Sequence, residues 1–122
     1  MYEVLVKSDF SSAHNLRGYK GKCEALHGHN WKIEARFQKE TLNDIGLTAD
    51  FSDLKSMLKA ALKKLDHTYL NELDVFKKDN PSAENIARHI YKELKSSVKE
   101  KDLLVKSVSV WESDASCATY FE

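Results

Sequence analysis

The feature that most constrains the fold of this chain is a run of alternation over residues 27–38. His27, His29 and the apolar side chains that follow share one parity, and mostly polar or charged residues fill the other. Successive side chains of a strand point to opposite faces, so the run predicts a β-strand with one covered face. Residues 2–14 alternate similarly, with one exception, and end at His14. The sequence therefore predicts two half-buried strands that carry three histidines on their covered faces.

Beyond residue 50 the apolar spacing changes to three and four, which predicts helices that pack on the sheet. The first stripe consists of Phe51, Leu54, Leu58, Ala61, Leu62 and Leu65. Asp50 is its expected N-cap, and Asn80-Pro81-Ser82 signals a second helix with Pro81 at or near the first turn. The second stripe consists of Ile86, Ala87, Ile90, Tyr91, Leu94 and Val98.

The final segments, residues 103–112 and 115–121, are rich in Val and aromatic residues and flank Ser113-Asp114, which predicts a closing hairpin. The predicted order is strand, strand, helix, helix, strand, strand. This is an α+β fold in which two helices cover one face of a four-stranded sheet. Its two unpaired edges favour edge-to-edge oligomerisation.

Composition limits the class of protein. With 122 residues, 42% of them hydrophobic, the chain is expected to form one globular domain over residues 1–122. Nineteen basic side chains balance nineteen acidic ones, which argues against a broad nucleic-acid or anionic-membrane surface. No apolar run approaches the ~20 residues of a membrane span and no signal peptide is recognisable, so a cytoplasmic protein is expected. Cys23 and Cys117 are then free thiols rather than a disulfide scaffold.

The three histidines suggest a metal centre. His27 and His29 lie two apart on one strand, so their imidazoles point the same way, and His14 ends the neighbouring strand. Three histidine ligands with a fourth position left to water or substrate suit catalytic zinc. Two alternatives stay open: buried, hydrogen-bonded histidines without a metal, or a structural site that Cys23 closes as a fourth ligand.

Other residues suit acid–base chemistry. Cys23 ends a basic, glycine-bearing loop, where a neighbouring cation would favour its thiolate; an inert thiol is the alternative. Asp66 and His67 follow the first helical stripe, and a direct contact between them requires that the helix has ended. Glu112 shares the parity of the two preceding valines, which predicts a carboxylate on the covered face that ligand N–H groups could pair. A solvent-facing Glu112 is the alternative.

Six elements span nearly the whole chain: Phe10-Ser11-Ser12-Ala13-His14, Cys23-Glu24-Ala25-Leu26-His27-Gly28-His29, Asp50-Phe51 with Leu54-Lys55, Leu65-Asp66-His67, Pro81-Ser82-Ala83-Glu84-Asn85 and Glu112. Together they resemble the 6-pyruvoyltetrahydropterin synthase and 6-carboxytetrahydropterin synthase family. The resemblance implies a tunnelling fold (T-fold), a four-stranded antiparallel sheet with two helices on one face. It also implies that these sheets join into a barrel in a trimer and that two trimers stack as a homohexamer.

The resemblance also implies roles for individual residues. The Zn²⁺ ligands would be His14, His27 and His29. Cys23 matches the catalytic base, and Asp66 and His67 match an acid and relay pair that meets the cysteine across a subunit boundary. Glu112 matches the glutamate that accepts hydrogen bonds from the pterin ring. Ser82 and Glu84 match a segment near the pterin pocket.

The substrate that the resemblance implies is 7,8-dihydroneopterin triphosphate. The small bacterial-type members convert it to 6-carboxy-5,6,7,8-tetrahydropterin with loss of acetaldehyde and triphosphate, on the route to queuosine. By charge and loop position, our candidates for triphosphate contacts are Arg17, Lys20 and Lys22. Two other activities stay open: formation of the pyruvoyl product, or side-chain cleavage to 6-hydroxymethyl-dihydropterin for folate with Glu24 taking part. A non-catalytic zinc-stabilised pterin-binding module is the last alternative.

Overall fold

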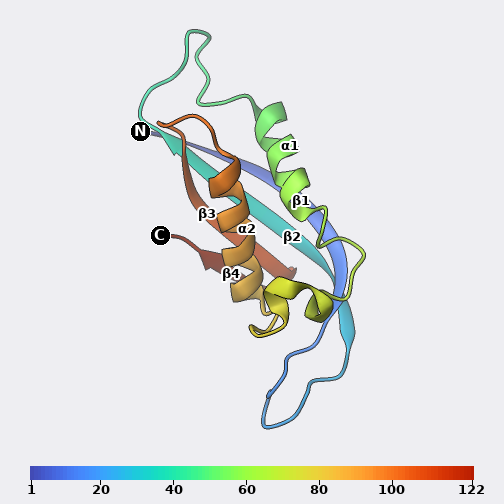
Figure 1. Cartoon of the computed structure of the whole chain (residues 1–122). Coiled ribbons are helices and arrows are strands. Elements are labelled where there is room, and N and C mark those ends of the chain that lie inside the picture. Colours follow the sequence, from blue (N-terminus) through green and yellow to red (C-terminus); the bar gives the residue numbers. More distant parts are fainter.

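Four strands form one antiparallel sheet in the order β1-β2-β3-β4, and two helices cover one of its faces (Figure 1). The computed structural model describes residues 1–122. The elements are β1 (Tyr2–His14), β2 (His27–Lys39), α1 (Phe51–Leu62), the 3₁₀ helices η1 (Leu70–Glu72) and η2 (Asp74–Phe76), α2 (Ala83–Ser97), β3 (Leu104–Ser113) and β4 (Ser116–Tyr120). The predicted α+β class and the predicted order of strands and helices are confirmed.

The register of the β1–β2 hairpin sets the position of the histidines. The two strands pair along their whole length, from Tyr2 opposite Lys39 to His14 opposite His27. Side chains directly opposite each other in an antiparallel pair lie on the same face, so this register brings His14 and His27 together. His29 lies two residues further along that face.

The core fills the space between the sheet and the helices. β2 contributes four fully buried side chains: Trp31, Ile33, Ala35 and Phe37. The helices contribute most of their predicted stripes: Leu54, Leu58, Leu62, Ile86, Ala87, Ile90, Tyr91 and Leu94. Ala61 and Val98 are partly buried against the core, with Val98 at the C-cap of α2, whereas Phe51, the first residue of α1, remains 53% exposed. Leu65 is buried as predicted, although it lies beyond the end of the helix.

Polar side chains cap both helices. Asp50 accepts a hydrogen bond from the Ser52 N–H at 2.8 Å, as predicted, and Ser82 accepts one from the Asn85 N–H at 3.2 Å. Pro81 therefore precedes the N-cap of α2 and lies just outside the first turn. Neither helix combines the length and the apolar character that a membrane span needs.

The N-cap of α1 allows a stability prediction. Asp50→Ala removes the side-chain acceptor of the Ser52 N–H, which has no partner within the helix. We expect the free energy of unfolding to fall by about 1 kcal/mol. Urea denaturation followed by circular dichroism measures this change. Ser52→Ala is the matched control, since the Ser52 hydroxyl takes no part in the cap. Equal stability of the two variants would show that the cap contributes nothing.

β3 and β4 form the predicted closing hairpin, with its turn at Asp114-Ala115 rather than at Ser113-Asp114. The pairing of the two strands shifts register between Trp111 and Ser113, on either side of Glu112. Such irregularities bend a strand and redirect a side chain. Glu112 thus lies at a bulge near the end of β3.

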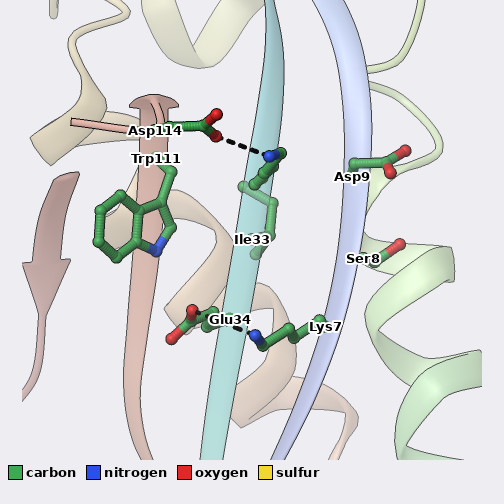
Figure 2. Close-up of a pocket in the computed structure, with 8 residues that line it drawn as sticks. Lys7, Ser8, Asp9, Ile33, Glu34, Trp111 and Asp114 are labelled. Atoms are coloured by element: carbon green, nitrogen blue, oxygen red, sulfur yellow. Dashed lines mark hydrogen bonds and ion pairs between the residues drawn. The ribbon is translucent and has the colours of Figure 1, made fainter. Parts of the chain in front are cut away.

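The face of the sheet opposite the helices is charged and carries a hollow of about 440 Å³ (Figure 2). Its lining residues are Lys7, Ser8, Asp9, Lys32, Ile33, Glu34, Trp111 and Asp114. Ion pairs join Lys7 to Glu34 at 3.9 Å and Lys32 to Asp114 at 2.7 Å. Charged side chains of the hollow alternate with core side chains along β2, so the hollow and the histidines lie on opposite faces of the sheet.

Candidate metal centre and active site

Three strands bring His14, His27, His29 and Glu112 to one point at the end of the sheet. One ligand atom from each residue lies within 4.8 Å of the others. The Nε2 atoms of His14 and His27 are 3.0 Å apart, and Glu112 Oε1 lies 2.9 Å from His29 Nε2 and 3.4 Å from His14 Nε2. Two nitrogens bound tetrahedrally to Zn²⁺ would be about 3.3 Å apart. The group therefore has the size of a single-ion site.

Backbone carbonyls orient two of the imidazoles. His14 Nδ1 lies 2.7 Å from the Pro81 carbonyl, and His27 Nδ1 lies 2.9 Å from the Ala25 carbonyl. A carbonyl only accepts, so each Nδ1 carries a proton, and in neutral imidazoles each Nε2 then presents a lone pair. Two lone pairs that face each other at 3.0 Å repel unless a cation or a shared proton lies between them. This is the arrangement that metal-binding histidines adopt.

His29 gives a second indication of a cation. Its Nε2 is buried and makes no hydrogen bond, although the Glu112 carboxylate oxygen lies 2.9 Å away. Burial lowers the pKa of His29, Glu112 opposes this effect, and the charges of His14 and His27 lower the pKa further. The imidazole is therefore favoured in the neutral form that metal binding requires. The donor set fits a divalent metal ion.

Glu112 lies on the covered face, as its parity predicts, with its side chain 38% exposed. The parity of Glu112 does not predict that its carboxylate lies against two of the histidines. Its approach depends on the pairing of β2 with β3 and on the bulge, because Trp111, the preceding residue, pairs with Lys32. The carboxylate is thus placed next to any ligand that reaches the metal position.

Cys23 lies outside the histidine group, exposed in the loop between β1 and β2. The loop turns at Gly18 and Gly21, both of which have φ near +77°, where glycine is favoured. Glu112, and not Cys23, is the fourth residue beside the histidines. The chain alone therefore does not form a closed Cys-His₃ site.

Glu24, next to Cys23, is bound within the loop. Its carboxylate accepts a hydrogen bond from the Leu16 N–H at 3.2 Å, and its own N–H donates to the Leu16 carbonyl at 2.9 Å. The same carboxylate lies 3.8 Å from His27 Nδ1. Glu24 thus stabilises the loop through its hydrogen bonds to Leu16, next to the candidate metal ligand His27.

Asp66 and His67 contact each other directly because α1 has already ended at Leu62. Asp66 Oδ1 lies 2.9 Å from His67 Nδ1, and it also accepts a hydrogen bond from the Ser11 N–H at 3.0 Å. That backbone hydrogen bond is the main reason that the pKa of Asp66 is lowered, and His67 lowers it further. His67 has φ of 55° and a side chain that is 82% exposed. Its imidazole is therefore open to another molecule.

The remaining candidate residues differ in their surroundings. Ser82 is the N-cap of α2, and Glu84 is exposed in the first turn of that helix. Lys20 and Lys22 are exposed, and Lys20 lies over the Tyr19 ring. Arg17 has partners within its own chain, because its guanidinium Nη2 donates to the Phe76 and Asp79 carbonyls.

The fold and the site together define a T-fold protein with a candidate metal centre at one end of its sheet. The family model described as 6-pyruvoyl tetrahydropterin synthase matches residues 3–122. The chain therefore belongs to the 6-pyruvoyl tetrahydropterin synthase family.

Comparisons with individual proteins agree with this assignment. A Synechocystis protein named 6-carboxy-5,6,7,8-tetrahydropterin synthase is 34% identical over 126 residues, which cover 99% of this chain and 94% of the relative. A Pyrococcus furiosus protein named dihydroneopterin monophosphate aldolase is 31% identical over 111 residues, covering 91% and 90%. The solved structure of Caenorhabditis elegans 6-pyruvoyl tetrahydropterin synthase has a TM-score of 0.86 at 23% identity, over 99% of this chain and 95% of that one. This last similarity shows the shared fold.

Proposed function

We propose that this chain is a zinc-dependent 6-carboxy-5,6,7,8-tetrahydropterin synthase that acts in queuosine biosynthesis. It would convert 7,8-dihydroneopterin triphosphate to the carboxy product with release of acetaldehyde and triphosphate. The observation that carries the proposal is the convergence of three histidines and Glu112 in a chain of this family. The name of the Synechocystis relative supports the choice of product.

In this proposal His14, His27 and His29 would hold Zn²⁺ through their ring nitrogens. Bound zinc supplies Lewis-acid chemistry, acidifying the side-chain hydroxyls of the substrate and stabilising the oxyanion. The carbonyls of Pro81 and Ala25 hold two of the imidazoles in the required tautomer. The chain's own contribution is therefore to fix the ligands.

Cys23, Asp66 and His67 move the protons in this proposal. Cys23 acts as the base, and the Asp66–His67 pair, in contact at 2.9 Å, provides the acid and relay. The pair belongs to an exposed turn and Cys23 to an exposed loop. This exposure supports a site completed between two subunits.

Glu112 anchors the pterin in this proposal by accepting hydrogen bonds from the ring N–H groups. Its carboxylate is partly exposed and lies beside His29, so a ring held there would bring its side chain to the metal position. Ser82 and Glu84 follow Pro81, whose carbonyl contacts His14, so both residues are close in sequence to the metal position. We assign them to the pterin pocket.

The proposal extends to assembly and location. The single domain of residues 1–122 would assemble as a cytoplasmic homohexamer, a dimer of trimers, with active sites at subunit interfaces and no nucleic-acid or membrane partner. The open edges of β1 and β4 support this assembly.

Anaerobic incubation of the metal-loaded protein with 7,8-dihydroneopterin triphosphate tests the proposal. Mass spectrometry should identify 6-carboxytetrahydropterin and acetaldehyde, and chelation should abolish both. A pterin that keeps all three side-chain carbons would indicate the pyruvoyl product. Complete absence of turnover would leave a non-catalytic pterin-binding module, which the position of Cys23 outside the histidine group does not favour.

Side-chain cleavage to 6-hydroxymethyl-dihydropterin is the second candidate function. The Pyrococcus relative named as an aldolase and the presence of Glu24 beside Cys23 favour it. Against it, the Glu24 carboxylate already accepts the Leu16 N–H. A hydroxymethyl product in the same incubation, lost in Glu24→Gln and retained in Cys23→Ala, would establish this function instead.

Metal binding should also raise the thermal stability of the protein. A ligand that binds only the folded state, at a free concentration one hundred times its Kd, stabilises by about 2.7 kcal/mol. We therefore expect saturating Zn²⁺ to raise the Tm of metal-free protein by roughly 10 °C. Calorimetry with and without Zn²⁺ measures this shift, and Mg²⁺ serves as the control because it prefers oxygen ligands. An identical Tm in both metals would contradict a histidine-bound zinc site.

A further inference from the structure

The orientation of His14 depends on a carbonyl in an irregular segment. His14 Nδ1 lies 2.7 Å from the carbonyl of Pro81, which is buried between η2 and α2, outside both helices. We infer that Arg17 is a positioning residue for the metal centre, holding the segment that carries this carbonyl against His14. The inference rests on the metal site of the proposed function, and it assigns Arg17 a role other than the triphosphate contact expected from its charge.

Arg17 makes four hydrogen bonds to one short stretch of chain. Its guanidinium Nη2 donates to the Phe76 carbonyl and, at 3.1 Å, to the Asp79 carbonyl. Its backbone N–H donates to Asn80 Oδ1 at 2.9 Å, and its carbonyl accepts from Asn80 Nδ2 at 2.9 Å. These contacts place the stretch after η2 against the start of the loop that follows β1. Arg17 thus fixes residues 76–80 up to the residue before Pro81.

The other side of Pro81 is fixed by α2. Asn85 Nδ2 donates to the Asn80 carbonyl at 2.8 Å, and the Asn85 N–H donates to the Ser82 hydroxyl at 3.2 Å. Pro81 is therefore held between Asn80, which Arg17 binds, and Ser82, the N-cap. Its carbonyl has little freedom to leave His14.

The physical role of the contact follows from the chemistry of histidine ligands. A hydrogen bond to Nδ1 fixes the tautomer and the ring orientation, and loss of such a partner typically lowers metal affinity by about 10–100-fold. Both side-chain hydrogen bonds leave one nitrogen, Nη2, whose N–H groups have fixed directions in the guanidinium plane, whereas the donors of a lysine ammonium rotate on a flexible stem. Arg17 therefore acts through its shape rather than through its charge alone.

The test is Arg17→Lys, which keeps the positive charge and removes the planar guanidinium. Zn²⁺ affinity is measured by competition with a chromophoric chelator, without substrate, so that a triphosphate contact cannot influence the result. We expect affinity about 10-fold or more below that of the unaltered protein. Arg88→Lys is the matched control, because Arg88 reaches the Asp79 side chain at 3.2 Å on the surface and should leave affinity unchanged.

Cobalt provides a second readout. The visible absorption of the Co²⁺-loaded protein reports ligand geometry, and we expect it to change in Arg17→Lys and not in Arg88→Lys. A lower Tm of metal-free Arg17→Lys with unaltered Zn²⁺ affinity and Co²⁺ spectrum would reduce Arg17 to a structural residue and overturn the inference. If the Arg17 variant does not fold, Asn80→Ala replaces it, because it removes two of the hydrogen bonds between Arg17 and this segment, and unchanged Zn²⁺ affinity of that folded variant would overturn the inference equally.

These outcomes separate the inference from the proposed function. If the unaltered protein binds no Zn²⁺, the proposed metal site fails and the inference fails with it. If the unaltered protein binds Zn²⁺ and Arg17→Lys binds it equally well, only the inference fails. In that case a raised KM for the triphosphate substrate would return Arg17 to the role of a triphosphate contact.

Discussion

His29→Ala is expected to lose both metal binding and turnover. His29 Nε2 is buried without a hydrogen bond and faces the Glu112 carboxylate, and a metal ion held between them would pair with both groups. Loss of an indirect partner of a metal ligand already costs about 10–100-fold in affinity, and loss of a ligand itself should exceed about 100-fold. Without Lewis-acid stabilisation worth several kcal/mol, kcat/KM should fall at least about a thousandfold.

Asn30→Ala is the matched control for this variant. Asn30 is the next residue of β2, lies on the other face of the strand and is exposed. Elemental analysis of both purified variants gives metal content, and the product assay gives turnover. Full metal content in His29→Ala, or loss of metal in both variants, would contradict the three-histidine site.

Cys23→Ala should separate catalysis from metal binding. Cys23 is exposed in its loop and lies outside the group that could hold a metal, so the variant should fold and retain one equivalent of metal. Removal of a positioned general base typically costs about 10²–10⁴-fold in rate, and we expect kcat to fall within that range. The assay combines metal content, Tm and product formation.

Cys117→Ala is the control for the loss of a thiol, because Cys117 is exposed on β4 and its thiol lies 3.9 Å from the Thr119 hydroxyl, away from the histidine group. It should retain full activity. Joint loss of metal and folding in Cys23→Ala would instead indicate that the cysteine closes a structural site. Unimpaired turnover in Cys23→Ala would remove it from the mechanism.

The sequence predicted the parts of the fold that local periodicity determines. Alternation in residues 2–14 and 27–38 was enough to place the histidines on covered faces, because successive side chains of a strand point to opposite faces. The apolar spacing of three and four residues likewise predicted the buried faces of both helices. Phe51 was the error, because periodicity does not tell where along a helix its contact with the sheet begins.

The contacts that depend on distant pairing could not be predicted from pattern alone. Glu112 and His29 are far apart in the sequence, and their side chains meet only because β3 pairs with β2 in the observed register.

 Arg36 of β2 and Ser109 of β3, which are 73 residues apart in the sequence, illustrate this long-range pairing. Arg17 is a similar case, because its charge suggested an anionic ligand whereas the fold supplies carbonyls from a distant segment.

The contact between Asp66 and His67 could be predicted in part from the sequence. The end of the apolar stripe indicated roughly where α1 stops, and adjacent residues can meet only outside a helix. The hydrogen bond from the Ser11 N–H, which orders the Asp66 carboxylate, joins the turn to the edge of β1 and has no local sequence signal.

The most direct test of the central claim is an anomalous diffraction map at the zinc edge, from crystals of protein loaded with one equivalent of Zn²⁺. We expect one peak per chain, about 2.0–2.1 Å from the Nε2 atoms of His14, His27 and His29, with Cys23 outside the coordination sphere. A peak elsewhere, or a peak with Cys23 Sγ as a ligand within the same chain, would contradict the account of an open, catalytic three-histidine centre.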